Sequence, residues 1–247
     1  MKSIAFYNLK GGVGKTAAAV NLAYLSARSQ IPTLLWDVDP QGSTSWYFPQ
    51  EKTESFKLSR LIKKKDPIGK LIQKTDFSHL DIIPSSLGMR NADIDFDNHG
   101  EATTIDHWLA LLSEQYSLVI FDCAPNISQF SESIFHTVDL IYMPMIPTHL
   151  SMQTYEKVLG FFQEQNIKTK KLRPFFSMVD RRKRLHREFY ENPPIKLKKQ
   201  LSGFIPYASQ IEQMGSFRKP VFEFAPKCAG ALAYELLWEQ IRDQLKL

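Results

Sequence analysis

The sequence predicts an α/β fold, with a doubly wound and mainly parallel sheet that helices cover on both faces. Short apolar runs rich in β-branched and aromatic residues recur along the 247-residue chain, and segments with helical character lie between them. The runs are continuously apolar rather than alternating, which is typical of strands buried on both faces. The repeated order of strand, helix and strand favours parallel strands joined by helical crossovers.

Seven apolar runs are the expected strands. They lie at Ile4–Tyr7, Thr33–Trp36, Leu80–Ile83, Leu118–Phe121, Leu140–Met145, Pro174–Val179 and Phe204–Ile205. The sequence has no internal repeat, no low-complexity tract and no long linker rich in Gly, Ser or Pro. We therefore expect a single domain over residues 1–247.

Composition indicates a globular chain with a sizeable core, because 43% of the residues are hydrophobic and 23% are charged. No apolar run approaches the length of about 18 residues that a membrane-spanning helix needs, and the N-terminus lacks the layout of a secretory signal. A cytoplasmic protein without membrane contact is the expectation. Cys123 and Cys228 are too few for a disulfide framework or a zinc site, and both are expected to be small buried hydrophobes.

The C-terminal segment Ala231–Leu247 is predicted to be a helix. Leu232, Leu236, Leu237, Ile241 and Leu245 are assigned to one apolar face of it. That face suits either core packing or a membrane surface. The polar face carries Glu235, Glu239 and Asp243 rather than a basic stripe, which favours packing.

A glycine-rich segment follows the first expected strand. Residues 8–16 read Asn-Leu-Lys-Gly-Gly-Val-Gly-Lys-Thr and precede an alanine-rich helix predicted at Ala17–Ser29. Strand, glycine loop and helix are the context of a phosphate-binding loop, in which main-chain N–H groups and the helix N-terminus converge on phosphate oxygens. Lys15 would then neutralise the β and γ phosphates of a nucleotide, and the Thr16 hydroxyl would hold magnesium.

Carboxylates end two later strands. Asp37 and Asp39 follow the second expected strand, and Asp122 ends the run Leu118–Phe121. Open α/β sheets bind ligands at the carboxyl ends of their strands, so these side chains should lie beside the phosphate loop. Asp122 fits a Walker B strand, whose carboxylate binds a magnesium-coordinated water. Asp-x-Asp alone is more often turn chemistry, but its place behind a phosphate loop favours a functional role.

Together these motifs resemble the ParA/MinD family of deviant Walker A ATPases, and its ParA-like branch in particular. The loop reads KGGVGKT, with Leu9 in place of the first glycine of the ordinary pattern, and Lys10 is the additional lysine of that family. Asp37–Gly42 resembles the D-x-D-P-Q-G box, and Cys123–Pro125 resembles the D-C-P-P turn with Ala124 as the variant position.

The resemblance implies an ATP-dependent homodimer that sandwiches two MgATP, with Lys10 reaching the partner's phosphates as an arginine finger does. It implies that Asp39 orients or activates the attacking water and that Asp37 holds magnesium through its water shell. The implied catalytic residues are Lys10, Lys15 and Asp39, and the implied metal-binding residues are Thr16, Asp37 and Asp122. The implied nucleotide-binding residues are Lys10, Gly11, Gly12, Val13, Gly14, Lys15, Thr16, Ala17 and Pro206.

The resemblance continues towards the C-terminus. Pro144–Leu150, Met178–Asp180 and Gly215–Pro220 are similar to stretches of the family, and Phe204–Ala208 lies where members often read I-P-R-N. Tyr207 and Ala208 replace the arginine and asparagine, so the resemblance does not imply a contact from that arginine to a base or to DNA. Pro206 is expected to border the adenine.

Positive charge is concentrated late in the chain, within residues 168–199, although the formal net charge of the whole chain is only +5. The candidate DNA-binding residues are Arg181, Arg182, Lys183, Arg184, Arg187, Lys196, Lys198 and Lys199. Clustered cations bind nucleic-acid phosphates through counterion release without reading bases. A solvated helix face is the alternative interpretation of such a run.

The sequence-based interpretation is therefore a slow, partner-stimulated ATPase that binds nucleoid DNA without sequence preference. It would segregate or position a cargo, such as a plasmid, a chromosome or a protein complex, with the help of a ParB-like or cargo-adaptor protein. A MinD-like membrane-cycling ATPase and a metabolic phosphate-loop kinase or ligase remain alternatives. A nitrogenase-type iron–sulfur reductase is disfavoured, because neither cysteine lies where two subunits could share a cluster.

Overall fold

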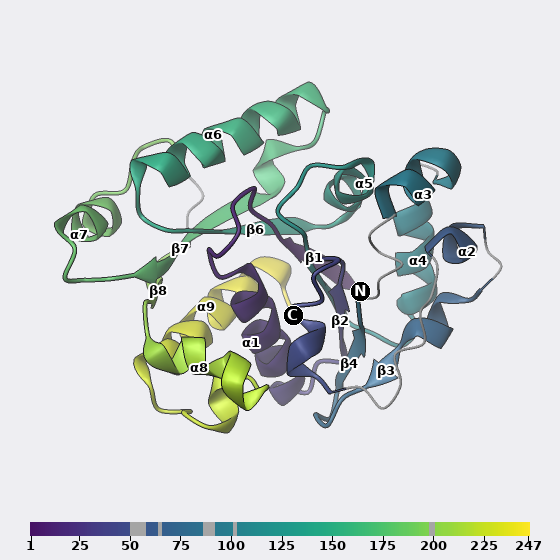
Figure 1. Ribbon diagram of the computed structural model, residues 1–247, viewed down its shortest axis with the longest axis horizontal. Coiled ribbons are helices and arrows are strands. Elements are labelled where there is room, and N and C mark those ends of the chain that lie inside the picture. The colour runs from purple at the N-terminus through teal and green to yellow at the C-terminus, as the bar shows by residue number, and fades with distance from the viewer. Residues whose placement is uncertain (50–57, 64–65, 86–91, 101–102, 198–200) are drawn as a thin grey trace.

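The computed structural model describes residues 1–49, 58–63, 66–85, 92–100, 103–197 and 201–247. Its described strands form one sheet in the order β3-β4-β2-β5-β1-β6-β7-β8 (Figure 1). The strands are β1 (Lys2–Phe6), β2 (Thr33–Asp37), β3 (Gln73–Lys74), β4 (Leu80–Ile83), β5 (Leu118–Asp122), β6 (Leu140–Met145), β7 (Leu172–Val179) and β8 (Phe204–Pro206). Neighbouring strands are parallel, except that β3 pairs antiparallel with β4. The predicted doubly wound α/β fold is confirmed.

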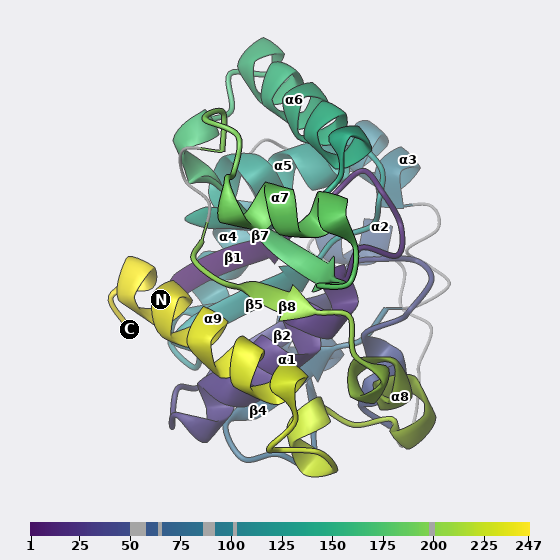
Figure 2. The ribbon, with the colours of Figure 1, turned by 90° about the vertical axis from the view of Figure 1, so that its left-hand side faces the viewer.

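Helices cover both faces of the sheet, as Figures 1 and 2 show. On one side lie α1 (Lys15–Arg28), α8 (Ser209–Phe217) and α9 (Ala229–Leu245). On the other side lie α3 (Ala92–His99), α4 (Thr104–Leu112), α5 (Gln129–Thr137), α6 (His149–Glu164) and α7 (Arg184–Glu191), with α2 (Leu58–Ile62) beside α3. Short 3₁₀ turns are η1 (Ser45–Tyr47), η2 (Ile68–Leu71), η4 (Thr169–Lys171) and η5 (Val221–Glu223).

The central strands explain the continuous apolar runs. In β1, Ile4 and Phe6 belong to the core on the side of α1 and α9, whereas Ala5 belongs to the core on the other side. In β5 the residues from Leu118 to Asp122 are all buried, and those from Leu118 to Phe121 alternate between the two cores in the same way. Both faces of a strand must be apolar when helices cover both faces of the sheet. All seven predicted strands are present, with ends shifted by no more than two residues, whereas the two-residue β3 was not predicted.

The buried face of helix α9 differs from the predicted one. Leu237, Ile241 and Leu245 are buried, but Leu232 and Leu236 are 52% and 62% exposed. Successive residues of an α-helix are turned by about 100°, so Leu232 lies about 180° from Ile241 around the helix axis. The assignment of these leucines to one face was therefore wrong, and Tyr234 and Trp238 complete the buried face instead. None of the described helices is long and apolar enough to cross a membrane.

The two cysteines also differ from each other. Cys123 is buried as predicted, while Cys228 is only partly buried, so the prediction for Cys228 was wrong. Cys228 precedes α9, and its sulfur accepts a hydrogen bond from the Ala231 N–H at 3.4 Å. A group that caps a helix start satisfies one of the free N–H groups there, and this place keeps Cys228 near the surface.

Strand β8 forms one edge of the described sheet. Just before it, the Gln240 side chain of α9 accepts a hydrogen bond from the Ser202 N–H at 2.7 Å and donates one to the Ser202 carbonyl at 3.0 Å. Unpaired main-chain groups at a sheet edge are a template for pairing with another strand. Gln240 removes that opportunity at Ser202.

Candidate functional site

The glycine loop connects β1 to α1, as the sequence predicts, and turns through two left-handed residues. Gly12 has φ +67° and Gly14 has φ +94°, a region that residues with a side chain rarely adopt. Gly14 is the N-terminal cap of α1, and its carbonyl accepts from the Ala18 N–H at 3.0 Å. The loop therefore places successive N–H groups and a helix N-terminus around one point, which is an anion-binding arrangement.

Asn8 braces this loop and was not predicted as a site residue. Its Oδ1 accepts from the Lys10 N–H at 2.9 Å, and its Nδ2 donates to the Pro144 carbonyl at the end of β6 at 2.8 Å. Asn8 is 1% exposed, so the amide ties the loop to a neighbouring strand inside the core. The Pro144 contact joins residues far apart in the chain, and no local pattern could have revealed it.

Lys15 points back into its own loop. Its Nζ donates to the Lys10 carbonyl at 3.0 Å, and the residue is 7% exposed. Burial lowers the pKa of Lys15, while the carboxylates of Asp122 and Asp39 oppose that shift. Its ammonium group lies inside the loop, where it can bind a phosphate.

Asp122 at the end of β5 joins the loop to the segment that follows β2. Its Oδ2 accepts from the hydroxyls of Thr16 and Thr44, each at 2.7 Å. Its Oδ1 is buried and has no hydrogen-bond partner within the part of the chain that the structure describes. A buried acceptor without a donor is costly, and a metal-bound water is a suitable donor. The pair of Thr16 and Asp122 fits a hydrated magnesium ion.

Asp37 lies opposite Asp122 in the β2–β5 register and is fully buried. Its Oδ2 accepts from the Ser45 N–H at 2.8 Å and from the Ser45 hydroxyl at 2.7 Å. Burial raises the pKa of Asp37, and the nearby charge of Asp122 raises it further, whereas the hydrogen bonds from Ser45 oppose the shift. Burial likewise raises the pKa of Asp122. Such a pair favours a bound cation, which stabilises both ionised forms.

We expect the free energy of unfolding of the nucleotide-free protein to depend on this pair. A raised pKa in the folded state stabilises the fold at low pH. That contribution is lost as the pH rises from the ordinary carboxyl value of 3.8 through the folded-state value. A tenfold difference in proton affinity between the folded and unfolded states corresponds to about 1.4 kcal/mol. Urea denaturation between acid and neutral pH checks this, with Asp37→Asn as the comparison. The variant should lose less stability than the native chain as the pH rises, and parallel curves would contradict the expectation.

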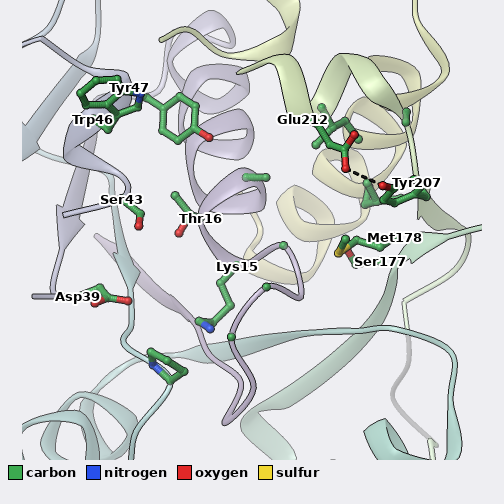
Figure 3. Close-up of a pocket in the computed structure, with 18 of the residues that line it drawn as sticks. Lys15, Thr16, Asp39, Ser43, Trp46, Tyr47, Ser177, Met178, Tyr207 and Glu212 are labelled. Carbon is green, nitrogen blue, oxygen red and sulfur yellow. Dashed lines mark hydrogen bonds between the residues drawn. The ribbon is translucent and has the colours of Figure 1, made fainter. Parts of the chain in front are cut away.

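A cavity of about 750 Å³ opens beside these groups (Figure 3). Its volume lies in the range of about 300–1,000 Å³ that is usual for small-molecule sites. Of the predicted site residues, Gly11, Gly12, Gly14, Lys15, Thr16, Ala17, Asp39 and Pro206 line it. Asp39 faces the cavity, and its Oδ1 accepts from the Gln41 N–H at 2.9 Å. The cavity is not lined by Lys10, Val13, Asp37 or Asp122, and the last three of these residues are buried.

The far end of the cavity is formed by β7, β8 and α8. Figure 3 shows Tyr207 and Glu212 on the side opposite Trp46 and Tyr47, and the Tyr207 hydroxyl donates to Glu212 at 2.7 Å. Met178 also lines this end with φ +55°, at an irregularity in the pairing of β7 with β8. A non-glycine residue held in this conformation is strained, and such strain is often found at functional sites. Of the residues at this end of the cavity, only Pro206 was predicted as a site residue.

The basic run forms the turn before α7 and the exposed side of that helix. His186 and Phe189 are buried, and His186 Nδ1 accepts from the Asp180 N–H at 3.0 Å, which holds the turn in place. The cations from Arg181 to Arg184 and Arg187 are exposed. Three of the predicted cations have acidic neighbours: Arg182 contacts Asp180, Arg184 contacts Glu188 and Lys196 contacts Glu156. Lys198 and Lys199 lie outside the described residues.

Comparisons with known proteins agree with this geometry. Residues 1–174 match the AAA_31 family model, which describes an AAA domain. The chain is 26% identical to the chromosome-partitioning ATPase Soj of Treponema pallidum over 97% of its own length and 96% of that protein. A putative plasmid partition protein of Borrelia burgdorferi bound to AMPPNP shares the fold, with a TM-score of 0.81, 22% identity and 98% coverage of both chains.

The septum site-determining protein MinD of Pyrococcus horikoshii, complexed with Mg-ADP, also shares the fold. Its TM-score is 0.77 at 17% identity, over 98% of this chain and 96% of the other. The predicted resemblance is confirmed. The chain belongs to the AAA_31 family of AAA domains and to the ParA-like branch of the ParA/MinD family.

Proposed function

We propose that this protein is an ATP-dependent switch that dimerises around two MgATP molecules, hydrolyses them slowly and binds nucleoid DNA without sequence preference. In this proposal it segregates or positions a cargo, and a ParB-like protein or cargo adaptor stimulates its hydrolysis. The names of its relatives, a chromosome-partitioning ATPase and a plasmid partition protein, support the partitioning role. Magnesium and a nucleotide are bound in neighbours of the same fold.

The nucleotide would lie along the cavity, with its phosphates at the glycine loop and its base at Pro206. Lys15 would exchange its contact with the Lys10 carbonyl for the β and γ phosphates. Thr16 would turn its hydroxyl towards magnesium, and Asp37 and Asp122 would hold the water molecules around that ion. When bound, magnesium would neutralise charge on the phosphates. Asp39, which faces the cavity, would orient the attacking water.

The observation that carries the proposal is the position of Lys10. Both of its main-chain groups are held, the N–H by Asn8 and the carbonyl by Lys15. Its side chain does not line the cavity of its own chain, and no ion pair of it is found among the described residues. A backbone held at both groups, with a cation that does not line the cavity of its own chain, suits delivery to a second copy. That delivery makes hydrolysis conditional on pairing.

DNA binding is supported by the exposed cations around α7. Ion pairs between exposed side chains are weak, so DNA phosphates can displace Asp180 and Glu188 from their arginines. Arg181, Lys183 and Arg187 have no ion pair within the described ranges. The buried contact of His186 fixes the turn, so that the cations project from one corner of the molecule.

A binding assay on a non-specific DNA duplex, with magnesium and AMPPNP, tests this part of the proposal. We expect retention that falls steeply with salt. The double variant Lys183→Ala with Arg187→Ala should lower the slope of log affinity against log salt by about two, one for each cation removed. The matched control is Lys168→Ala with Lys170→Ala, which removes two exposed cations elsewhere. Absence of retention by the native protein at low salt would remove DNA from the proposal.

A further inference from the structure

The segment Ser43–Tyr47 connects two parts of the cavity that lie far apart in the sequence. On one side it holds both buried carboxylates: Thr44 donates to Asp122, and Ser45 donates twice to Asp37. These contacts orient the oxygens that the proposed magnesium site needs. If the Thr16 hydroxyl turns towards a metal ion, Thr44 is the remaining donor to Asp122 Oδ2 among the described residues.

On its other side the segment is fastened to α8. The Trp46 Nε1–H donates to the Gly215 carbonyl at 2.9 Å, and the Arg218 Nε–H donates to the Trp46 carbonyl at 2.9 Å. The Arg218 guanidinium carbon also lies 4.1 Å from the centre of the Trp46 ring, which is a cation–π contact. Trp46 is 53% exposed, so polar and cation–π contacts hold it rather than burial. We call these contacts the Trp46–Arg218 clasp.

Helix α8 itself reaches the far end of the cavity. Ile211 and Glu212 in its first turns line the cavity, while Gly215 and Arg218 at its other end form the clasp. A single helix therefore touches the proposed base site directly and the proposed metal site through Trp46. In Figure 3, Trp46 and Tyr47 lie on one side of the cavity and Glu212 lies on the other.

We propose that Trp46 and Arg218 are positioning residues for magnesium, because the clasp holds Thr44 and Ser45 against the two carboxylates. This inference rests on the proposed MgATP site. The clasp contributes to the gain in nucleotide affinity that magnesium produces. Arg218 does not line the cavity, so loss of its guanidinium leaves metal-free nucleotide binding unchanged. Coupling of this kind is reciprocal, so magnesium also changes the surroundings of Trp46.

The variant Arg218→Gly tests the proposal without a backbone penalty. Arg218 has φ +52°, which glycine adopts freely, so the substitution removes the guanidinium contacts and relieves strain. ADP affinity is measured by calorimetry in EDTA and in magnesium. We expect native affinity in EDTA and a magnesium-dependent gain reduced about tenfold, the size of one hydrogen bond plus a cation–π contact. Lys219→Ala removes the neighbouring exposed cation, and magnesium should raise its ADP affinity as much as that of the native protein.

Tryptophan fluorescence gives a second measurement. Trp36, Trp108 and Trp238 are at most 4% exposed, so a change in acrylamide quenching reports chiefly on Trp46. Addition of magnesium to the ADP complex should change quenching in the native protein and not in Arg218→Gly. Trp46→Phe keeps a ring for the guanidinium but loses the Nε1–H bond, and it should lose part of the affinity gain.

The possible outcomes separate the two proposals. If magnesium raises the ADP affinity of Arg218→Gly as much as that of the native protein, the proposed role of the clasp is overturned. The proposed MgATP site is not affected by that result. An equal loss of affinity in EDTA and in magnesium would also overturn the proposed role of the clasp, because that role would then be structural. Native protein that binds no ADP in either solution would overturn the proposed function, and the clasp with it.

Discussion

Lys10→Ala is expected to abolish nucleotide-dependent pairing and to lower ATP turnover by about a thousandfold or more, the range of cations delivered in trans. The substitution leaves the main-chain contacts of residue 10 with Asn8 and Lys15 available, so the loop should keep its shape. Binding of ATP to the monomer should therefore be close to native. Sedimentation with AMPPNP and a phosphate-release assay measure the two losses.

Mixing two inactive variants shows whether Lys10 acts across the dimer. In a dimer of Lys10→Ala with Asp39→Ala, one site has an intact Asp39 and receives Lys10 from its partner. Each mixed dimer has one complete site, so an equal mixture should recover turnover, up to about a quarter of the native value if half of the dimers are mixed. A mixture as inactive as its components would contradict delivery in trans. If Lys10→Ala alone pairs and hydrolyses ATP as the native protein does, only nucleotide binding remains of the proposal.

Gly14→Ala is expected to weaken nucleotide binding by about a hundredfold or more, because backbone strain and a steric clash act together at this residue. Gly14 has φ +94°, and a Cβ there would lie 2.7 Å from the Ser177 hydroxyl of β7. Backbone strain in this region costs about 1–3 kcal/mol, and relief of the clash would displace the start of α1 from the phosphates. Calorimetric titration with ADP and magnesium measures the loss of affinity, and thermal unfolding measures the loss of stability.

Two companion variants separate the causes. Gly11→Ala adds the same methyl group where nothing lies within 4 Å, so the nucleotide-free protein should unfold at the native temperature. Ser177→Ala combined with Gly14→Ala removes the clash and keeps the backbone strain, and it should recover part of the lost stability. If the double variant is no more stable than Gly14→Ala, the contact with Ser177 is not the obstacle.

Much of the site could be predicted because its chemistry is local in sequence. A loop that wraps phosphates needs glycines, a lysine and a hydroxyl within a few residues, and carboxylates at strand ends reach the same edge of a parallel sheet. The central strands were predictable for a related reason. Burial on both faces requires continuous apolar runs, and the runs at Leu80–Ile83 and Leu140–Met145 have the bounds of β4 and β6.

The supporting residues could not be predicted, because their partners lie far away in the chain. Asn8 contacts Pro144, Thr44 contacts Asp122, and Trp46 contacts Gly215. The residues next to Thr44 and Trp46 in the sequence do not indicate such contacts. The prediction for the C-terminal leucines was wrong for a different reason. The five residues assigned to one face do not lie at similar angles around the helix axis.

The hydrogen bonds of Gln240 to Ser202 bear on how copies of this chain can associate. A strand of another copy that paired as far as Ser202, just before β8, would have to displace the Gln240 amide from both main-chain groups of Ser202. Edge-to-edge pairing between copies is therefore disfavoured at Ser202.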